Sequence, residues 1–167
     1  IDSFIIILNI MYEQISAFFT IEMIYLWLSF GVLPFWFILI FFPQSKICGL
    51  LATSIFPLLI LGSVYIYLLY HYFNTGYDFL GNFELYLGIY NLANLFENEA
   101  FLILFWTHFL AINLFCAAWI VRDSQKYFMS KYFNIIPLII TYFIGPVGIV
   151  VYWIIRIFFA KKISLFD

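Results

Sequence analysis

The stretch Ala100–Val121 constrains the fold of this chain more than any other part, because it carries no Asp, Glu, Lys or Arg and is long enough to cross a bilayer. About 20 consecutive apolar residues suffice for a transmembrane helix. The stretch also contains Trp106, His108 and Asn113, and polar groups at membrane depth usually face a partner, a cavity or a ligand. It therefore predicts a transmembrane helix with a polar face of structural or functional importance.

The composition indicates an integral membrane protein with a single all-α domain. Hydrophobic residues make up 66% of the chain and charged residues only 10%, whereas soluble domains carry about 25% charged residues. The net charge is −2, and the sequence has no basic run and no glycine-rich phosphate loop. No nucleic-acid partner is expected. We expect the protein in a bacterial inner membrane or an organelle membrane, with membrane lipids as partners.

Four apolar stretches predict a bundle of four transmembrane helices. The predicted domain covers residues 23–162, between an N-terminal lead-in at residues 1–22 and a tail at residues 163–167. The spans are expected at about residues 23–45, 47–72, 100–121 and 132–155. Pro34 falls within the first span, where a proline removes one backbone donor and kinks the helix.

The only sizeable polar connection lies between the second and third spans, at residues 77–99. It contains four acidic residues and no Lys or Arg. Leu85, Ile89, Leu92 and Phe96 recur at helical spacing, which predicts a short amphipathic helix on the membrane surface. An ordinary loop is the alternative interpretation of the same residues.

The basic residues favour one orientation but leave a conflict. Arg122, Lys126 and Lys131 follow the third span, and positively charged connections normally lie on the cytoplasmic side. With four complete spans, the charged residues from Arg156 onward would lie on the opposite side. A re-entrant last segment, broken at Gly145-Pro146, would remove this conflict and is the alternative to a fourth span.

Polar groups at membrane depth are the candidate site residues, and each has a structural alternative. At about 3.6 residues per turn, His108, Trp119 and Arg122 share one helix face, whereas Trp106 and Asn113 lie on another. Histidine is the usual acid–base side chain near neutral pH, so His108 is either a catalyst or a hydrogen-bonded structural residue. Asn113 has the character of a residue that joins helices.

The run Gly145-Pro146-Val147-Gly148 marks a weak point in the last helix. Its structural interpretation is a kink that lets the last helix pack on the third. Its functional interpretation is an opened backbone that contacts a ligand. No metal site is expected, because Cys48 and Cys116 lie far apart and the chain has only two histidines.

Aromatic residues make up 25% of the chain, with 23 Phe and 13 Tyr. One explanation is a lipid-facing surface together with a genome biased toward the corresponding codons. The other is an aromatic-lined groove for a long apolar ligand. Composition does not separate the two.

Four short sequence blocks occur in a fixed order across roughly residues 23–158. They are Leu33-Pro34-Phe35-Trp36 with Phe42-Pro43, the block WTHFLAINLF at residues 106–115, Trp119 with Arg122-Asp123, and Gly145-Pro146-Val147-Gly148. Together they resemble the abscisic-acid-deficient-four-like integral membrane proteins of plastids and bacteria. The resemblance implies a four-helix membrane protein whose plant relatives are tied to making neoxanthin from violaxanthin, an isomerisation that opens an epoxide to an allene.

The resemblance implies a carotenoid, or another lipid, as the ligand that the chain binds or isomerises. Epoxide opening needs an acid at oxygen and a base for the departing proton, which makes His108, Asp123 and Arg122 the catalytic candidates. The candidate ligand-binding residues are Trp36, Trp106, Asn113, Trp119, Gly145 and Pro146. The family usually has Asp at the position of Asn113, and because an amide does not titrate usefully, this departure argues against catalysis.

The alternative function belongs to another class. The chain would be a small non-catalytic subunit of a multisubunit photosynthetic or respiratory membrane complex, and a bound pigment or lipid would be structural. The amide of Asn113 fits this hypothesis. Whether the chain is an enzyme stays open in the sequence.

Overall fold

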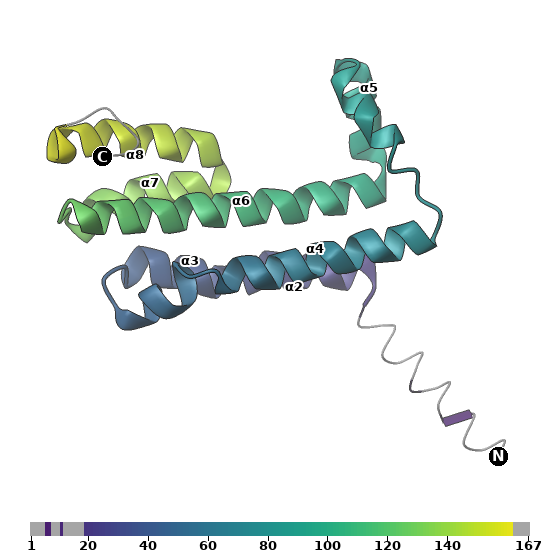
Figure 1. The fold of residues 1–167 in the computed structure, drawn as a ribbon, viewed down its shortest axis with the longest axis horizontal. Helices are drawn as coiled ribbons and strands as arrows, with labels where there is room; N and C mark the ends of the chain where they lie inside the picture. Colours follow the sequence, from purple (N-terminus) through teal and green to yellow (C-terminus); the bar gives the residue numbers. More distant parts are fainter. Residues whose placement is uncertain (1–5, 8–10, 12–18, 162–167) are drawn as a thin grey trace.

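The computed structural model describes residues 6–7, 11 and 19–161, and this part of the chain is helical with no β-strand (Figure 1). The predicted all-α class is confirmed. Most of the predicted lead-in and the whole predicted tail lie outside the described residues. Within the described part, three helical segments are long and apolar enough to cross a membrane: Ile21–Phe41, Cys48–Asn74 and Glu99–Lys126.

The first segment consists of helices α2 (Ile21–Gly31) and α3 (Leu33–Phe41), which meet at Val32. Pro34 lies in the first turn of α3. A proline is tolerated there because the first turn of a helix needs no amide donor from within the helix. The helix is therefore interrupted beside the predicted proline, but α2 and α3 together still form one segment long enough to cross a membrane.

The second segment begins with a short π-helical turn, η1 (Cys48–Ala52), and continues as α4 (Phe56–Asn74). Hydroxyl groups satisfy carbonyls at the interruption: Thr53 donates to Cys48 at 3.3 Å, and Ser54 donates to another carbonyl of η1 at 3.2 Å. Irregular backbone at membrane depth needs such partners, because no water is available to supply them.

The polar connection holds a 3₁₀ turn, η2 (Gly81–Tyr86), and the helix α5 (Ile89–Glu97), which projects away from the other helices (Figure 1). No residue of α5 is buried. The phenol of Tyr77 donates a hydrogen bond to Asn82 at 2.6 Å and anchors the preceding loop. Burial raises the pKa of Tyr77, so its phenol keeps its proton and remains a donor at neutral pH.

The third segment is the single long helix α6 (Glu99–Lys126), which is the central element of the fold. It spans about 42 Å at 1.5 Å per residue and packs against α2, α3, α4, α7 and α8. Half of its most apolar stretch is buried inside the protein, compared with 28% and 17% for the other two segments. The prediction that the fold is arranged around this stretch agrees with these contacts.

The structure corrects the fourth predicted span, because residues 132–155 do not form one continuous helix. They are divided between α7 (Lys131–Phe143) and α8 (Gly145–Ala160), which turn at Ile144 and pack antiparallel against each other (Figure 1). α7 measures only about 20 Å at 1.5 Å per residue, less than the roughly 30 Å thickness of the hydrocarbon core. The turn of this hairpin lies beside Asn113, near the middle of α6.

The helices α7 and α8 approach each other very closely at Gly148. A Cβ atom at Gly148 would lie 2.1 Å from Oγ1 of Thr141, 2.4 Å from its backbone nitrogen and 2.7 Å from the carbonyl oxygen of Pro137. Two of these three atoms belong to the backbone and cannot rotate away. Only glycine fits where α8 lies against α7. The run Gly145-Pro146-Val147-Gly148 therefore follows a tight turn between two helices and does not form a kink within one helix.

The end of α6, the start of α7, the end of α8 and the turn after α3 lie at one end of the molecule (Figure 1), and these segments carry the cations of the described residues. This basic end carries Lys46, Arg122, Lys126, Lys131, Arg156 and Lys161. The opposite, acidic end carries Glu22, Asp78, Glu84, Glu97 and Glu99. The charge conflict of the four-span prediction disappears, because α8 returns to the end from which α7 starts.

Candidate functional site

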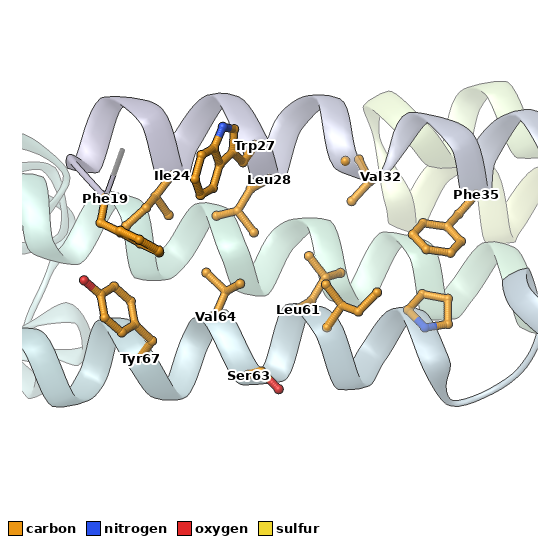
Figure 2. Close-up of a pocket in the computed structure, with 13 residues that line it drawn as sticks. Phe19, Ile24, Trp27, Leu28, Val32, Phe35, Leu61, Ser63, Val64 and Tyr67 are labelled. Carbon is orange, nitrogen blue, oxygen red and sulfur yellow. The ribbon is translucent and has the colours of Figure 1, made fainter. Parts of the chain in front are cut away.

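A groove of about 570 Å³ lies between the first helical segment and α4 (Figure 2). We call it the apolar groove, because among its described lining residues only Ser63 and Tyr67 carry hydroxyl groups. Ser63 already donates to the carbonyl of Leu59 at 2.8 Å. The lining residues are Phe19, Ile24, Trp27, Leu28, Gly31, Val32, Phe35, Pro57, Ile60, Leu61, Ser63, Val64 and Tyr67.

Aromatic rings gather at the end of the apolar groove that lies toward the acidic end of the molecule (Figure 2). The ring of Phe19 lies 5.7 Å from that of Trp27 and 6.1 Å from that of Tyr67. At the other end, Phe35 lies 6.3 Å from Phe56. Such a groove can hold an elongated apolar molecule through burial and dispersion contacts.

A second arrangement, the charged cluster, joins the end of α6 to α8 and consists of Asp123, Tyr127, Tyr152 and Arg156. Nε of Arg156 and the phenol of Tyr152 each donate to Oδ2 of Asp123 at 2.6 Å. Nη2 of Arg156 donates to the phenol oxygen of Tyr127 at 2.9 Å. Tyr152 and Arg156 are four residues apart on α8, so they share the helix face that meets Asp123.

Aromatic rings enclose the guanidinium group of the charged cluster. Cζ of Arg156 lies 4.7 Å from the ring centres of both Tyr127 and Trp153. The side chains of Arg156 and Asp123 are 1% and 9% exposed. A buried ion pair is tolerated only when its remaining hydrogen-bonding groups are also satisfied, and the two phenols meet that need.

A cavity of about 620 Å³ lies beside the charged cluster, between the start of α4 and the end of α6. We call it the interfacial pocket. Its walls combine apolar side chains with three charged ones, Arg122, Asp123 and Lys126. The full lining is Ala52, Thr53, Ser54, Ile55, Pro57, Leu58, Leu114, Phe115, Ala118, Trp119, Arg122, Asp123 and Lys126.

The structure does not bring the three predicted catalytic residues together. Arg122 and Asp123 line the interfacial pocket, but His108 lies exposed on the outer face of α6. The separation between His108 and Asp123 along the helix is about 22 Å at 1.5 Å per residue. No group of three or more His, Cys, Asp or Glu side chains in the described residues could hold a metal.

The three predicted tryptophans occupy different places. Trp36 is buried in α3 and packs edge-on against Tyr142 of α7 at 5.2 Å. Trp106 donates to the hydroxyl of Ser29 on α2 at 3.1 Å. Trp119 lines the interfacial pocket, with Tyr152 and Trp153 at 5.7 and 5.9 Å.

Asn113 and Gly145 meet at the turn of the hairpin, while Pro146 is exposed. Asn113 is 4% exposed, and its Oδ1 atom occupies the place where a side chain at residue 145 would begin. Its amide nitrogen has no hydrogen-bond partner among the described residues. This arrangement agrees with Asn113 as a residue that joins helices.

The sequence reasoning missed Tyr152 and Arg156, and it did not single out the groove residues. An arginine placed four residues after a tyrosine in an otherwise apolar segment was the available signal for the charged cluster. No comparable signal marks Trp27 and Val64, because aromatic and branched apolar residues occur throughout the chain.

The family comparison agrees with the fold and the sequence blocks. The family model described as ABA DEFICIENT 4-like matches residues 23–152. The chain is also 30% identical, over 99 residues, to "Protein ABA DEFICIENT 4, chloroplastic" of Arabidopsis thaliana, a match that covers 58% of this chain and 44% of that protein. No solved structure matches. The chain, an all-helical protein with three helical segments in its described part able to cross a membrane, belongs to the ABA DEFICIENT 4-like family.

Proposed function

We propose that the protein binds a long isoprenoid of the xanthophyll class, with part of the polyene chain in the apolar groove. The observation that carries this proposal is the groove itself, an aromatic-ended channel of about 570 Å³ between two membrane-spanning segments. Small-molecule sites typically measure about 300–1,000 Å³. Membership of the family, through its resemblance to plant proteins of neoxanthin synthesis, supports the class of ligand.

The dimensions of the groove suit one section of an elongated chain. From Ile24 to Phe35 the helix axis advances about 16 Å, and from Pro57 to Tyr67 about 15 Å, at 1.5 Å per residue. A rigid polyene would run along this axis between Leu28 and Val64. The phenol of Tyr67, at the acidic end of the groove, can meet a ring hydroxyl of the ligand.

We propose binding rather than turnover as the function of this chain. Both carboxylate oxygens of Asp123 already accept hydrogen bonds, from Tyr152 and Arg156. His108 lies about 22 Å away by helical rise, and Asn113 cannot act as an acid. No acid–base pair of the predicted residues therefore meets at one place.

The arrangement in the membrane follows from the charges. We propose three complete spans, with α7 and α8 as a re-entrant hairpin that enters and leaves through the basic end. The cations then all lie on the cytoplasmic side, as positively charged segments normally do. The helix α5, none of whose residues is fully buried, would rest on the membrane surface at the acidic end.

A substitution that fills the apolar groove with a larger side chain tests whether the groove is the ligand site. Val64→Trp places a large ring between α4 and Leu28, whereas Leu59→Trp places the same ring on the lipid-exposed side of α4, where Leu59 is 58% exposed. Purified variants in detergent are titrated with a xanthophyll, and binding is followed by induced circular dichroism of the polyene. We expect Val64→Trp to weaken binding at least about tenfold, equivalent to about 1.4 kcal/mol.

The control variant Leu59→Trp should bind the xanthophyll within about twofold of the unaltered protein, a difference of about 0.4 kcal/mol. Equal binding by both variants would remove the groove as the ligand site. Absence of polyene dichroism in the unaltered protein would remove the xanthophyll proposal itself. Helical circular dichroism shows whether each variant is folded.

The second candidate function, a non-catalytic subunit of a larger complex, is favoured by the position of His108. This side chain is exposed on a membrane-spanning helix and has no hydrogen-bond partner among the described residues. Polar groups at such depth are costly in lipid, and a partner subunit would cover His108. Gentle purification from the native membrane tests this: His108→Leu should lose a stoichiometric partner, and a protein that purifies alone excludes the complex.

A further inference from the structure

The interfacial pocket has a different chemistry from the apolar groove, because cations and a hydrocarbon-facing rim meet in one cavity. We propose that it binds the headgroup of an anionic phospholipid from the leaflet at the basic end, with the acyl chains along α4 and α6. This site has only Pro57 in common with the lining of the proposed xanthophyll groove. Binding in the interfacial pocket would depend on an anionic phospholipid, whereas binding in the apolar groove would not.

The cations of the pocket point to an anion. Arg122 and Lys126 are four residues apart on α6, so they lie on the same helix face and both line the cavity. Arg122 is exposed and makes no ion pair or hydrogen bond with any described residue. An arginine fork matches the oxygens of a phosphate group particularly well.

The one carboxylate in the pocket does not cancel this charge. Asp123 lies 2.6 Å from Nε of Arg156 and also accepts from Tyr152, so its charge is already balanced within the protein. The guanidinium of Arg122 therefore faces the cavity beside a carboxylate that has its own counter-ion, and Lys126 lines the same cavity. A headgroup carrying one negative charge would balance the guanidinium of Arg122.

The rim of the pocket selects a lipid over a free phosphate ion. Ile55 and Phe115, which line the pocket from α4 and α6, are 67% and 54% exposed. Farther along the same helices, Leu59 and Ile112 are also exposed, which extends the apolar surface in the direction that acyl chains would take. Basic pockets between membrane helices on the cytoplasmic side are suited to anionic headgroups.

The test compares lipids on the intact protein. The purified chain is incubated with phosphatidylglycerol or with phosphatidylcholine of the same acyl chains, and bound lipid is counted by native mass spectrometry. We expect phosphatidylglycerol to bind at least about tenfold more tightly. The double variant Arg122→Gln, Lys126→Gln should lose this preference, while Lys131→Gln, which removes a cation outside the pocket, should keep it.

Three outcomes would overturn the proposal. Equal binding of the two lipids would show that charge is not recognised, and loss of the preference in Lys131→Gln would show a diffuse effect of the basic end. Inorganic phosphate that displaces the lipid at equal concentration would show an ion site instead. Xanthophyll titration of the double variant separates this test from the proposed function, because the apolar groove contains neither residue.

Discussion

Asp123 and Arg156 form an ion pair that the rest of the protein encloses almost completely, and this makes the two residues interdependent. Removal of one partner takes away the opposite charge that the buried group faces at 2.6 Å. Loss of one member of a buried pair typically costs about 3–5 kcal/mol. The charged cluster is therefore the place where a single polar substitution should matter most for the folded state.

We expect Asp123→Asn to lower the stability of the detergent-solubilised protein by about 3 kcal/mol, because the buried guanidinium of Arg156 then loses the carboxylate of Asp123. Thermal unfolding followed by helical circular dichroism measures the change. The neighbouring Arg122→Gln is the control, since its side chain is exposed, and it should stay within about 0.5 kcal/mol. Equal unfolding temperatures for Asp123→Asn and the unaltered protein would show that the pair does not hold α8 in place.

Several single residues could be anticipated from the sequence, but their partners could not. Trp119 is among the predicted ligand-binding residues and Arg122 and Asp123 are among the predicted catalytic residues, and all three line the interfacial pocket. Arg156, the partner of Asp123, lies 33 residues further along the chain. The turn at Ile144 lies between them, and the hydropathy of the sequence does not indicate this turn. His108 illustrates the opposite case, because a polar residue in a span need not point inward.

Among the helices, the hairpin of α7 and α8 depends on a single close contact. The backbone of α7 passes so near Gly148 that a methyl group there would overlap it. Gly62, in the middle of α4, has open space around the corresponding position. The two glycines therefore make a matched pair for testing which helix contact is essential.

We expect Gly148→Ala to destabilise the protein by about 1–3 kcal/mol, because the helices must separate to admit the methyl group. Gly62→Ala should be neutral or should stabilise α4 by up to about 1 kcal/mol through its higher helix propensity. Chemical or thermal unfolding in the same detergent compares the two. A Gly148→Ala protein as stable as Gly62→Ala would mean that α7 and α8 are not tightly packed.

The helices that sequence reasoning located best were those without interruption. α6 lies where the uncharged run predicted it, because length and composition alone decide such a helix. The segment at 132–155 is equally apolar, so hydropathy gave no sign that it forms two helices. The turn at Ile144 depends on Gly145, Pro146 and the fit of Gly148 against α7, which is a packing property rather than a local one.

For the whole molecule, the hairpin fixes which positions share a side of the membrane. With three spans and a re-entrant hairpin, Lys131 and Lys161 lie on the same side and Asp78 lies on the other. With four complete spans, Lys161 would lie on the side of Asp78. One labelling experiment distinguishes the two arrangements.

We expect single cysteines at Lys131→Cys and Lys161→Cys to react with a membrane-impermeant thiol reagent from the same side of sealed vesicles. Asp78→Cys should react only from the opposite side. The native Cys48 and Cys116 are first replaced by alanine. Labelling of Lys161→Cys from the side of Asp78→Cys would restore the fourth span and remove the re-entrant hairpin.

The hairpin also determines how the chain can be inserted during synthesis. In the proposed re-entrant arrangement, α8 returns to its starting side, so neither Arg156 nor Lys161 has to pass through the hydrocarbon core, where a central Arg or Lys costs about 2.5–3.5 kcal/mol even on biological insertion scales. The last two helices need no translocation machinery of their own. They can enter the bilayer from one surface and dock onto α6 after it is in place, so the last stage of assembly is a folding reaction rather than a crossing of the membrane.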